Sequence, residues 1–418
     1  MRVERIGAEG DGIATLPDGT PVYVPATIPG ESVSVRPIAR RGAGWSGIAE
    51  QVLVAAPDRV APPCPHFGGC GGCALQHWND RSYAAWKAGL LTEALRRAGF
   101  SDPPTAPLAR TPPGARRRTE LAFRRGRAGV ALGLHPAREA AVIDLESCPV
   151  LHPALFSLIA PLRPVLAGLQ GPRREGSVLI NLLDSGPDLL LRADAPPTAA
   201  DRAALARFAA AHRVPRISWA APGEVPEPVC QLGPVAHGFA GVTITPPPGA
   251  FLQASREGEA AIVQAVLAGL PEQMGSRARI IELYAGIGTI SFALVLRAAV
   301  TTYEGDGAVH AALQRAAGGT RVEVRHRDLA RMPVLARELG TAACVVLDPP
   351  HAGAARQVAE IAASRVGRVI YVSCNPATLA RDAAMLRAAG YALAAVTPID
   401  QFLWSARLES VTVFARSG

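Results

Sequence analysis

The chain has 418 residues, of which 49% are hydrophobic and 19% charged, so its composition excludes a disordered or fibrous protein and allows two or three domains. Its longest apolar runs, such as residues 287–296, are too short to span a membrane, and no secretion signal is visible, so we expect a cytoplasmic protein. The net charge of +8 favours an anionic partner such as nucleic acid.

Residues 1–56 are predicted to form a small β-barrel. Within residues 14–25, Asp18 and Gly19 separate two stretches of alternating apolar residues, which is typical of a hairpin. The strand pattern continues through residues 33–54. A proline-rich stretch at 56–63 then marks the boundary of this first domain.

Cysteines dominate the start of the next segment, which we take as a second domain over residues 57–238. Three of the seven cysteines stand in a C-x5-C-x2-C loop with four glycines, and a fourth follows a predicted strand at 140–145: Cys64, Cys70, Cys73 and Cys148. Four thiolates suit either structural zinc or an iron–sulfur cluster. Zinc sites more often show two C-x2-C pairs, so the spacing favours a cluster and leaves zinc as the alternative.

The rest of this segment is predicted to mix helices and strands. We expect helices over residues 80–98 and 196–213 and a strand-rich region over 115–195. Seven arginines and a single acid fall in one short stretch, which indicates either a phosphate-binding surface or a solvated basic loop: Arg110, Arg116, Arg117, Arg118, Arg124, Arg125 and Arg127.

The third domain, over residues 239–418, shows a different pattern of predicted secondary structure. From about residue 255 helical segments alternate with buried apolar strands that end in polar residues, as in a doubly wound α/β domain. The segment Glu282–Thr289 reads as a strand entering a glycine turn, and such turns bring the backbone close to a nucleotide-like ligand. Glu304 and Asp328 end the next two strands, so the pattern fits S-adenosylmethionine.

Three further motifs fall where the crevice of such a fold is expected. Asp348 ends an apolar strand before two prolines, and Cys374 ends another within the sequence Ser-Cys-Asn-Pro. The position of Cys374 at this edge predicts a nucleophile rather than a core thiol. Glu409 follows the Asp400-Gln401-Phe402 motif and precedes an apolar strand.

Together with Phe251–Ser255 and the cysteine loop, these motifs resemble the RNA uracil-5-methyltransferases over nearly the whole chain. More narrowly, they are similar to the iron–sulfur enzymes that form 5-methyluridine in bacterial 23S ribosomal RNA. The resemblance implies a multidomain α/β plus β architecture. It would comprise an N-terminal OB-like TRAM barrel, a central α+β iron–sulfur domain and a C-terminal Rossmann-like class I methyltransferase domain.

The resemblance also implies site residues. Cys374 would be the nucleophile and Glu409 the general base. The S-adenosylmethionine and uracil site would be lined by Gln253, Tyr284, Gly286, Thr289, Glu304, Asp328 and Asp348. A [4Fe-4S] cluster would be held by Cys64, Cys70, Cys73 and Cys148. The expected partner is RNA, ribosomal first and transfer RNA as an alternative, with a monomeric chain and no obligate protein partner or membrane.

Some positions depart from the family pattern. Ser255 replaces an asparagine, and His351 follows the two prolines where arginine is common. Leu403, Trp404 and Arg407 replace the usual residues before the base. The proposed nucleophile and base are present, so the departures bear on substrate contacts more than on the reaction.

The expected chemistry needs a thiolate, a base and a methyl donor. Carbon 5 of uracil becomes nucleophilic once a thiolate adds to carbon 6, and the carbon-5 proton must later pass to a base. The rival interpretations are a methyltransferase for an exocyclic amine, an RNA-binding protein with a drifted active site, and an iron–sulfur oxidoreductase. A Cys374 variant distinguishes uracil methylation from the first rival, because amine methylation needs no thiol and would survive the substitution.

Overall fold

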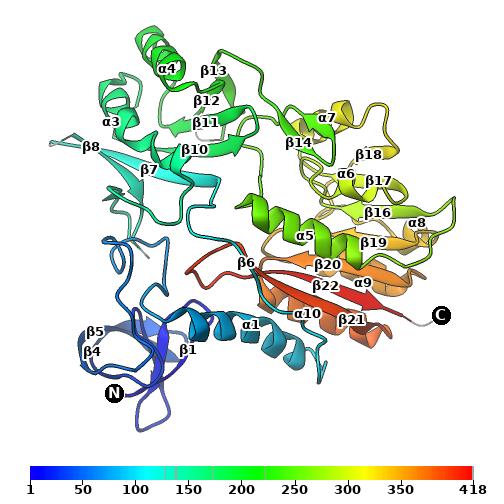
Figure 1. The fold of residues 1–418 in the computed structure, drawn as a ribbon, viewed down its shortest axis with the longest axis horizontal. Helices are drawn as coiled ribbons and strands as arrows, with labels where there is room; N and C mark the ends of the chain where they lie inside the picture. The colour runs from blue at the N-terminus through cyan, green and yellow to red at the C-terminus, as the bar shows by residue number, and fades with distance from the viewer. Residues whose placement is uncertain (128, 137–138, 173, 222, 417–418) are drawn as a thin grey trace.

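The structure is a computed structural model that describes the chain except for residues 128, 137–138, 173, 222 and 417–418. The N-terminal sheet has the order β1-β2-β3-β5-β4 and lies at the lower left of Figure 1. Its strands are β1 (Val3–Ile6), β2 (Gly12–Thr15), β3 (Pro21–Val24), β4 (Ser32–Arg41) and β5 (Gly44–Val54). The predicted hairpin is confirmed, since β2 and β3 pair antiparallel on either side of Asp18 and Gly19.

Most of the strands of residues 57–238 are divided between two sheets. The predicted helix over 80–98 is confirmed as α1 (Asp80–Arg97), which begins after the cap residue Asn79. It packs on α10 (Pro376–Ala388), far along the chain, and strand β6 (Ala109–Arg110) pairs with β21 (Ala392–Asp400). The first part of the segment therefore lies against the C-terminal part of the chain (Figure 1).

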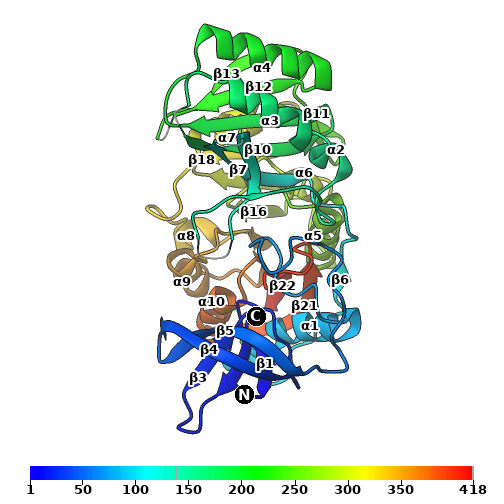
Figure 2. The ribbon, with the colours of Figure 1, turned by 90° about the vertical axis from the view of Figure 1, so that its left-hand side faces the viewer.

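The remainder of the segment forms a seven-stranded sheet of order β13-β12-β11-β10-β7-β8-β9, at the top of Figure 2. Its strands are β7 (Arg118–Gly126), β8 (Gly129–Leu134), β9 (Ile143–Asp144), β10 (Glu175–Leu183), β11 (Gly186–Ala193), β12 (Arg216–Ala220) and β13 (Glu227–Gln231). The helix predicted over 196–213 is α4 (Ala199–His212), which a Thr198–Asp201 capping box begins. The region predicted as strand-rich also contains α2 (Pro153–Phe156) and α3 (Ile159–Gly168), because His152 caps a helical turn that Pro153 can begin.

The C-terminal part is an eight-stranded sheet of order β18-β17-β16-β19-β20-β22-β21-β6. The strands from β18 to β20 are parallel and β22 is antiparallel to both neighbours. They are β16 (Arg279–Leu283), β17 (Ala299–Glu304), β18 (Val322–His326), β19 (Cys344–Leu347), β20 (Arg368–Ser373) and β22 (Glu409–Ala415). A separate hairpin of β14 (His237–Phe239) and β15 (Val242–Ile244) precedes this sheet.

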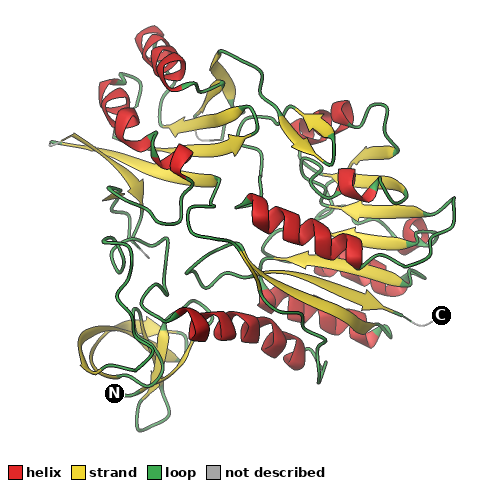
Figure 3. Cartoon of the chain, in the orientation of Figure 1, coloured by secondary structure: helices red, strands yellow, loops and turns green. Residues whose placement is uncertain are grey.

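Helices cover both faces of this sheet, as Figure 3 shows. One face packs on α5 (Arg256–Ala268), α6 (Ser291–Leu294) and α7 (Gly307–Ala316). The other packs on α1, α8 (Ala336–Leu339), α9 (Ala355–Ala363) and α10. Neighbouring strand residues such as Ile280 and Ile281 enter opposite cores, which is why these strands read as continuous apolar runs. No helix within the described residues is long and apolar enough to cross a membrane.

Candidate active site

The predicted site residues gather at one edge of the eight-stranded sheet, where the parallel strands end. The glycine turn follows β16, Glu304 ends β17, Asp348 follows β19 and Cys374 follows β20. Strands β16 and β19 are neighbours although two strands separate them along the chain, so the chain order reverses at this point. Ligands of doubly wound folds bind at such a reversal.

The glycine turn is tightly constrained. Tyr284, Gly286 and Gly288 have positive φ angles of 64°, 56° and 91°. A Cβ at Gly288 would lie 2.5 Å from the ring of Phe292, so only glycine fits there. The Gly286 amide donates to the Glu304 carboxylate at 2.8 Å, which ties this turn to the end of β17.

The remaining predicted cofactor residues lie around this turn. Thr289 is half-buried at the end of the turn. Asp328 lies beside Gly305, since a Cβ there would approach the Asp328 Cα within 3.3 Å. The Asp328 carboxylate accepts a hydrogen bond from the Ala330 amide at 3.0 Å. The structure therefore brings Tyr284, Gly286, Thr289, Glu304 and Asp328 into one region at the strand ends.

A chain of amides links the two carboxylates nearest the predicted nucleophile. The Gln253 side-chain amide donates to Asp348 at 3.4 Å. The Gln401 amide donates to the Gln253 side-chain oxygen at 2.8 Å and to Glu409 at 2.9 Å. Glu409 is 4% exposed, and its second carboxylate oxygen has no hydrogen-bond partner among the described residues. Such an unpartnered buried oxygen is available to accept a proton or a hydrogen bond.

Burial perturbs the titration of all three reactive groups. It raises the pKa of Asp348 to about 7 and that of Glu409 to about 8, where the nearby Asp348 charge adds to the effect. It also raises the pKa of the Cys374 thiol to about 11, with Glu409 and Asp348 contributing in the same direction and the Arg407 charge opposing them. Perturbed acids that converge at a strand edge are typical of a reactive site.

Cys374 opens into a cavity of about 530 Å³ whose wall comes from four separate parts of the chain. Its wall includes Glu9 from the N-terminal part and Gly72 from the cysteine loop. It also includes Ala94 of α1 and Ser405 of the segment before Glu409. His351 also lines this cavity, with its ring 3.7 Å from the Cys374 sulfur. The cavity is large enough for one nucleobase with its sugar.

The four predicted metal-ligating cysteines face a second cavity, of about 380 Å³. Cys64, Cys70, Cys73 and Cys148 all line it, together with Arg116. Within the described part of the chain, no group of three or more His, Cys, Asp or Glu side chains has the spacing to hold a metal ion. The two cavities share Gly71, Gly72, Ser405 and Arg407 in their walls.

Most of the arginine stretch is engaged within the protein. Arg110 pairs with Asp80 through two hydrogen bonds of 2.7 Å, and Arg124 pairs with Glu175. Arg117 is 1% exposed, pairs with Glu259 at 2.6 Å and donates to the Gln253 carbonyl. Neither of the two alternatives for this stretch, a phosphate-binding surface or a solvated basic loop, therefore describes Arg117, whose buried guanidinium group stabilises the fold.

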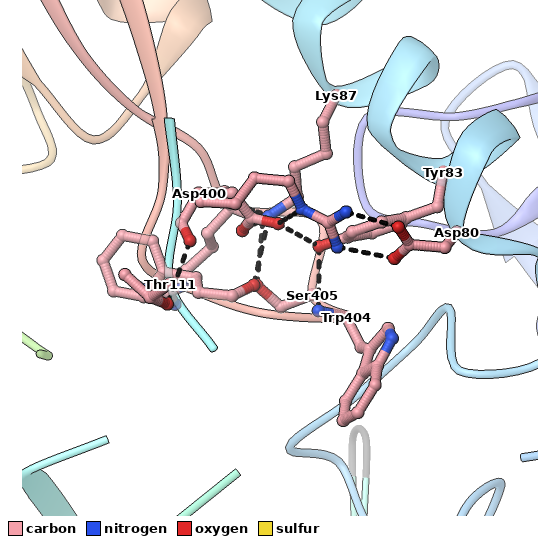
Figure 4. Close-up of polar contacts among 10 residues, drawn as sticks. Asp80, Tyr83, Lys87, Thr111, Asp400, Trp404 and Ser405 are labelled. Carbon is pink, nitrogen blue, oxygen red and sulfur yellow. Dashed lines mark hydrogen bonds and ion pairs between the residues drawn. The ribbon is translucent and has the colours of Figure 1, made fainter. Parts of the chain in front are cut away.

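A buried polar cluster holds the segment before Glu409, and the sequence did not reveal it. Lys87 is unexposed and donates to the Asp400 carboxylate at 2.5 Å and to the carbonyls of Phe402 and Arg407 (Figure 4). Tyr83 donates to the same carboxylate and accepts from the Trp404 amide, each at 2.8 Å. The sequence offers one hint of this cluster, namely that Lys87 is the only lysine of the chain.

Gln401, Glu282 and Asn375 were also given no role from sequence. Each was visible only as part of a motif, and its hydrogen-bond partners become evident only in the folded structure. Glu282 is 2% exposed and accepts from the Ser291 hydroxyl, and burial raises its pKa to about 8. Ser255, which departs from the family pattern, caps α5 by accepting from the Gly258 amide at 2.9 Å.

Comparison with known proteins places these features in a family. The family model described as tRNA (uracil-5-)-methyltransferase matches residues 320–417. A Brucella suis protein named as an RNA methyltransferase is 40% identical, over 100% of this chain and 97% of its own. The 23S rRNA (uracil(1939)-C(5))-methyltransferase RlmD of Chromohalobacter salexigens is 33% identical, over 100% of this chain and 89% of its own.

A solved structure supports the same fold. The tRNA (uracil-54, C5)-methyltransferase of Pyrococcus abyssi, in complex with S-adenosyl-L-homocysteine, has a TM-score of 0.73 and 20% identity, and the match covers 99% of this chain and all of that one. The fold is thus that of a Rossmann-like methyltransferase. The chain belongs to the RNA uracil-5-methyltransferase family, as the resemblance of its motifs predicts.

Proposed function

We propose that the protein methylates carbon 5 of a uridine in RNA with S-adenosylmethionine. The observation that carries this proposal is the placement of Cys374 on the wall of a nucleobase-sized cavity, at the strand edge that also holds Asp348 and Glu409. A thiol and a buried carboxylate are the two groups that the reaction needs. An amine methyltransferase would need no thiol there.

The chain's residues divide the reaction as follows. The Cys374 thiolate adds to carbon 6 of uracil, and the ring electrons move to carbon 5 and oxygen 4. Tyr284, Gly286, Thr289, Glu304 and Asp328 would hold S-adenosylmethionine, which would supply the methyl group to carbon 5 and leave as S-adenosylhomocysteine once its sulfur–methyl bond breaks. Glu409 then removes the carbon-5 proton through its unpartnered oxygen. The electron pair of that C–H bond reforms the double bond and expels the Cys374 thiolate.

Gln253 and Asp348 would orient the uracil. Both belong to the amide chain that ends at Glu409, so their hydrogen bonds set the position of the base catalyst. Asp348 and Glu409 also repel each other as anions, which favours retention of a proton by one of them before substrate enters.

We propose ribosomal RNA as the substrate, because the relative at 33% identity that covers the whole chain is a 23S rRNA enzyme. Transfer RNA is the second candidate, supported by the shared fold of the archaeal enzyme. The five-stranded N-terminal sheet would serve as the TRAM-type RNA-binding barrel, since it contributes to the wall of the Cys374 cavity. Unpaired RNA can then reach Cys374 with its target base unstacked.

We also propose that Cys64, Cys70, Cys73 and Cys148 hold a [4Fe-4S] cluster. All four line one cavity, as the ligands of a single cluster must. The C-x5-C-x2-C spacing with one distant cysteine, rather than two C-x2-C pairs, favours a cluster over structural zinc. The cluster would be structural, and cluster-free protein that keeps its fold and RNA affinity would contradict that role.

The test is methyl transfer from labelled S-adenosylmethionine by anaerobically purified protein to separate pools of unmodified ribosomal and transfer RNA. Digestion to nucleosides should place the label in 5-methyluridine, and the labelled pool identifies the substrate. Cys374→Ala should abolish transfer, and Glu409→Gln should accumulate a covalent RNA adduct because the carbon-5 proton cannot leave. A Cys374→Ala protein of near-normal activity would refute the proposed mechanism.

A further inference from the structure

One contact at the predicted nucleophile has no part in the scheme above. His351, in the loop after β19, places its Nδ1 atom 3.7 Å from the Cys374 sulfur, within hydrogen-bond distance for sulfur. The His351 side chain is exposed to the cavity that Cys374 opens into. An imidazole here can either accept the thiol proton at Nδ1 or donate an Nδ1–H hydrogen bond to the thiolate.

The neighbouring Asn375 decides between these two roles. Its side-chain oxygen accepts from the Ala377 amide at 3.0 Å and so caps α10, which fixes the orientation of the side-chain amide. The amide nitrogen therefore faces His351, where it donates to the carbonyl at 3.1 Å and to Nε2 at 3.3 Å. Because Nε2 accepts, the proton of the neutral ring is on Nδ1 and points at the sulfur.

The surroundings of Cys374 favour the neutral thiol. Burial, Glu409 and Asp348 all disfavour the thiolate, whereas a backbone hydrogen bond and the Arg407 charge favour it. Hydrogen bonds to charged acceptors are stronger than those to neutral ones, so an N–H aimed at this sulfur favours its ionised form. The same hydrogen bond would form again when the thiolate leaves carbon 6 at the end of the reaction.

We propose that His351 is a catalytic residue that donates its Nδ1–H to the Cys374 thiolate, with Asn375 as the positioning residue that selects this tautomer. The S–H bond breaks with its electron pair left on sulfur, and the proton passes to water in the cavity. His351 neither gains nor loses a proton in this step. The significance of the contact for catalysis rests on the proposed function, but the contact itself can be tested without RNA.

The test is the pH dependence of Cys374 alkylation by iodoacetamide in the full-length protein, followed by mass spectrometry of the Cys374 peptide. The midpoint of the rate against pH reports thiolate formation, and the plateau rate at high pH reports access to the sulfur. Removal of the donor in His351→Ala should raise the midpoint by about one pH unit, as expected for a charge-assisted hydrogen bond. His351→Asn, which keeps an N–H near the position of Nδ1, should restore most of the shift.

Two further variants test the positioning role and the specificity. Asn375→Ser keeps a capping oxygen for α10 and lacks the amide donor, so its midpoint should lie between those of the wild type and His351→Ala. His212→Ala, on α4 outside this site, should leave the midpoint unchanged, and the half-buried Cys230 serves as an internal reference thiol in every sample.

An unchanged midpoint in His351→Ala would overturn the proposal, as would a His351→Asn protein that behaves like the alanine variant. An Asn375→Ser midpoint equal to the wild type would overturn the assigned tautomer. Methyl transfer is measured in parallel on the same variants. If the wild type methylates no RNA while His351→Ala shifts the midpoint, the proposed function is refuted and the hydrogen bond is established. If the wild type is active and His351→Ala leaves the midpoint unshifted, only the role of His351 is refuted.

Discussion

Two buried carboxyl groups determine how the activity and the stability of this protein are expected to depend on pH: Glu409 for activity and Glu282 for stability. Burial raises the pKa of Glu409 to about 8, so at lower pH the proposed base carries a proton and cannot accept another. Under single-turnover conditions, we expect the release of methylated RNA from its preformed Cys374 adduct to rise with pH, about tenfold per unit, and to level off near that value. Glu409→Gln should show no such rise. A flat profile for the wild type would exclude Glu409 as the base.

Glu282 makes the complementary prediction for stability. Its pKa is raised from 4.5 to about 8 by burial, and the nearby Asp348 and Glu304 add to the effect. The folded state therefore holds a proton that the unfolded chain releases, and this stabilisation is present at low pH and lost as pH rises from 4.5 towards 8. The Glu282→Gln side chain cannot ionise, so the variant does not lose this stability as pH rises.

We expect the melting temperature of Glu282→Gln, relative to that of the wild type, to increase by roughly 5 °C when the pH is raised from about 5.5 to about 8. Differential scanning fluorimetry without cofactor measures the gain. Glu93→Gln, which removes an exposed carboxylate, is the control and should show no pH-dependent gain. A Glu282→Gln protein that tracks the wild type at both pH values would show that Glu282 ionises as readily in the fold as in the unfolded chain.

At the scale of elements, helix α1 acts as the support of the segment that leads to Glu409. Its Lys87 forms an unexposed ion pair with Asp400 at the end of β21 and also holds two carbonyls of the following segment (Figure 4). Lys87→Met leaves the buried Asp400 charge with Arg110, at 4.0 Å, as its remaining cation. Because the close ion pair is lost, we expect a cost of about 3 kcal/mol of unfolding free energy in urea titrations.

Two comparisons isolate this ion pair. The double variant Lys87→Met with Asp400→Asn should lose less than the sum of the single variants, because no uncompensated charge remains. Arg97→Met breaks the exposed Arg97–Glu93 pair on the same helix and should cost under about 1 kcal/mol. Additive losses in the double variant would mean that Lys87 and Asp400 contribute independently.

The same elements show what the sequence could and could not predict. The helix at α1, the β2–β3 hairpin and the alternation after residue 255 depend on local patterns and capping, so they were predictable. The attachment of α1 to residues 400–407 depends on contacts more than 300 positions apart, which no local pattern encodes. Gln401 is a similar case, since its role comes from Gln253 and Glu409 meeting it in space.

At the scale of the whole molecule, the proposed uridine cavity lies where the N-terminal part, the cysteine loop, α1 and the segment before Glu409 meet. Leu403 is 5% exposed in an apolar cluster with Ile6 and Ile28 of the N-terminal part and Leu75 and Trp78 after the cysteine loop. The departures from the family pattern before Glu409 therefore fall on an internal contact between parts of this chain. The Trp404 carbonyl adds to that contact by accepting from the amides of Ala74 and Leu75.

Gly10 offers a single-residue test of this arrangement. It has a φ of 87°, and a Cβ there would lie 2.9 Å from the Ala74 side chain and 3.5 Å from that of Ala406. Gly10→Val should push the N-terminal sheet away from the cysteine loop and the segment before Glu409. Gly19→Val is a matched control, because Gly19 has a φ of 85° and a Cβ at that position would meet nothing within 4 Å. Both variants carry the same backbone strain, of order 1 kcal/mol.

We expect Gly10→Val to lower kcat/KM for RNA by about tenfold or more while the Kd for S-adenosylmethionine, measured calorimetrically, stays within about twofold. The reason is that the glycine turn at β16 lies on the sheet itself, whereas the Cys374 cavity needs the N-terminal part for its wall. Gly19→Val should retain both values. Equal losses in the two variants would attribute the effect to strain alone, and unchanged RNA turnover in Gly10→Val would show that the N-terminal sheet does not shape the uridine site.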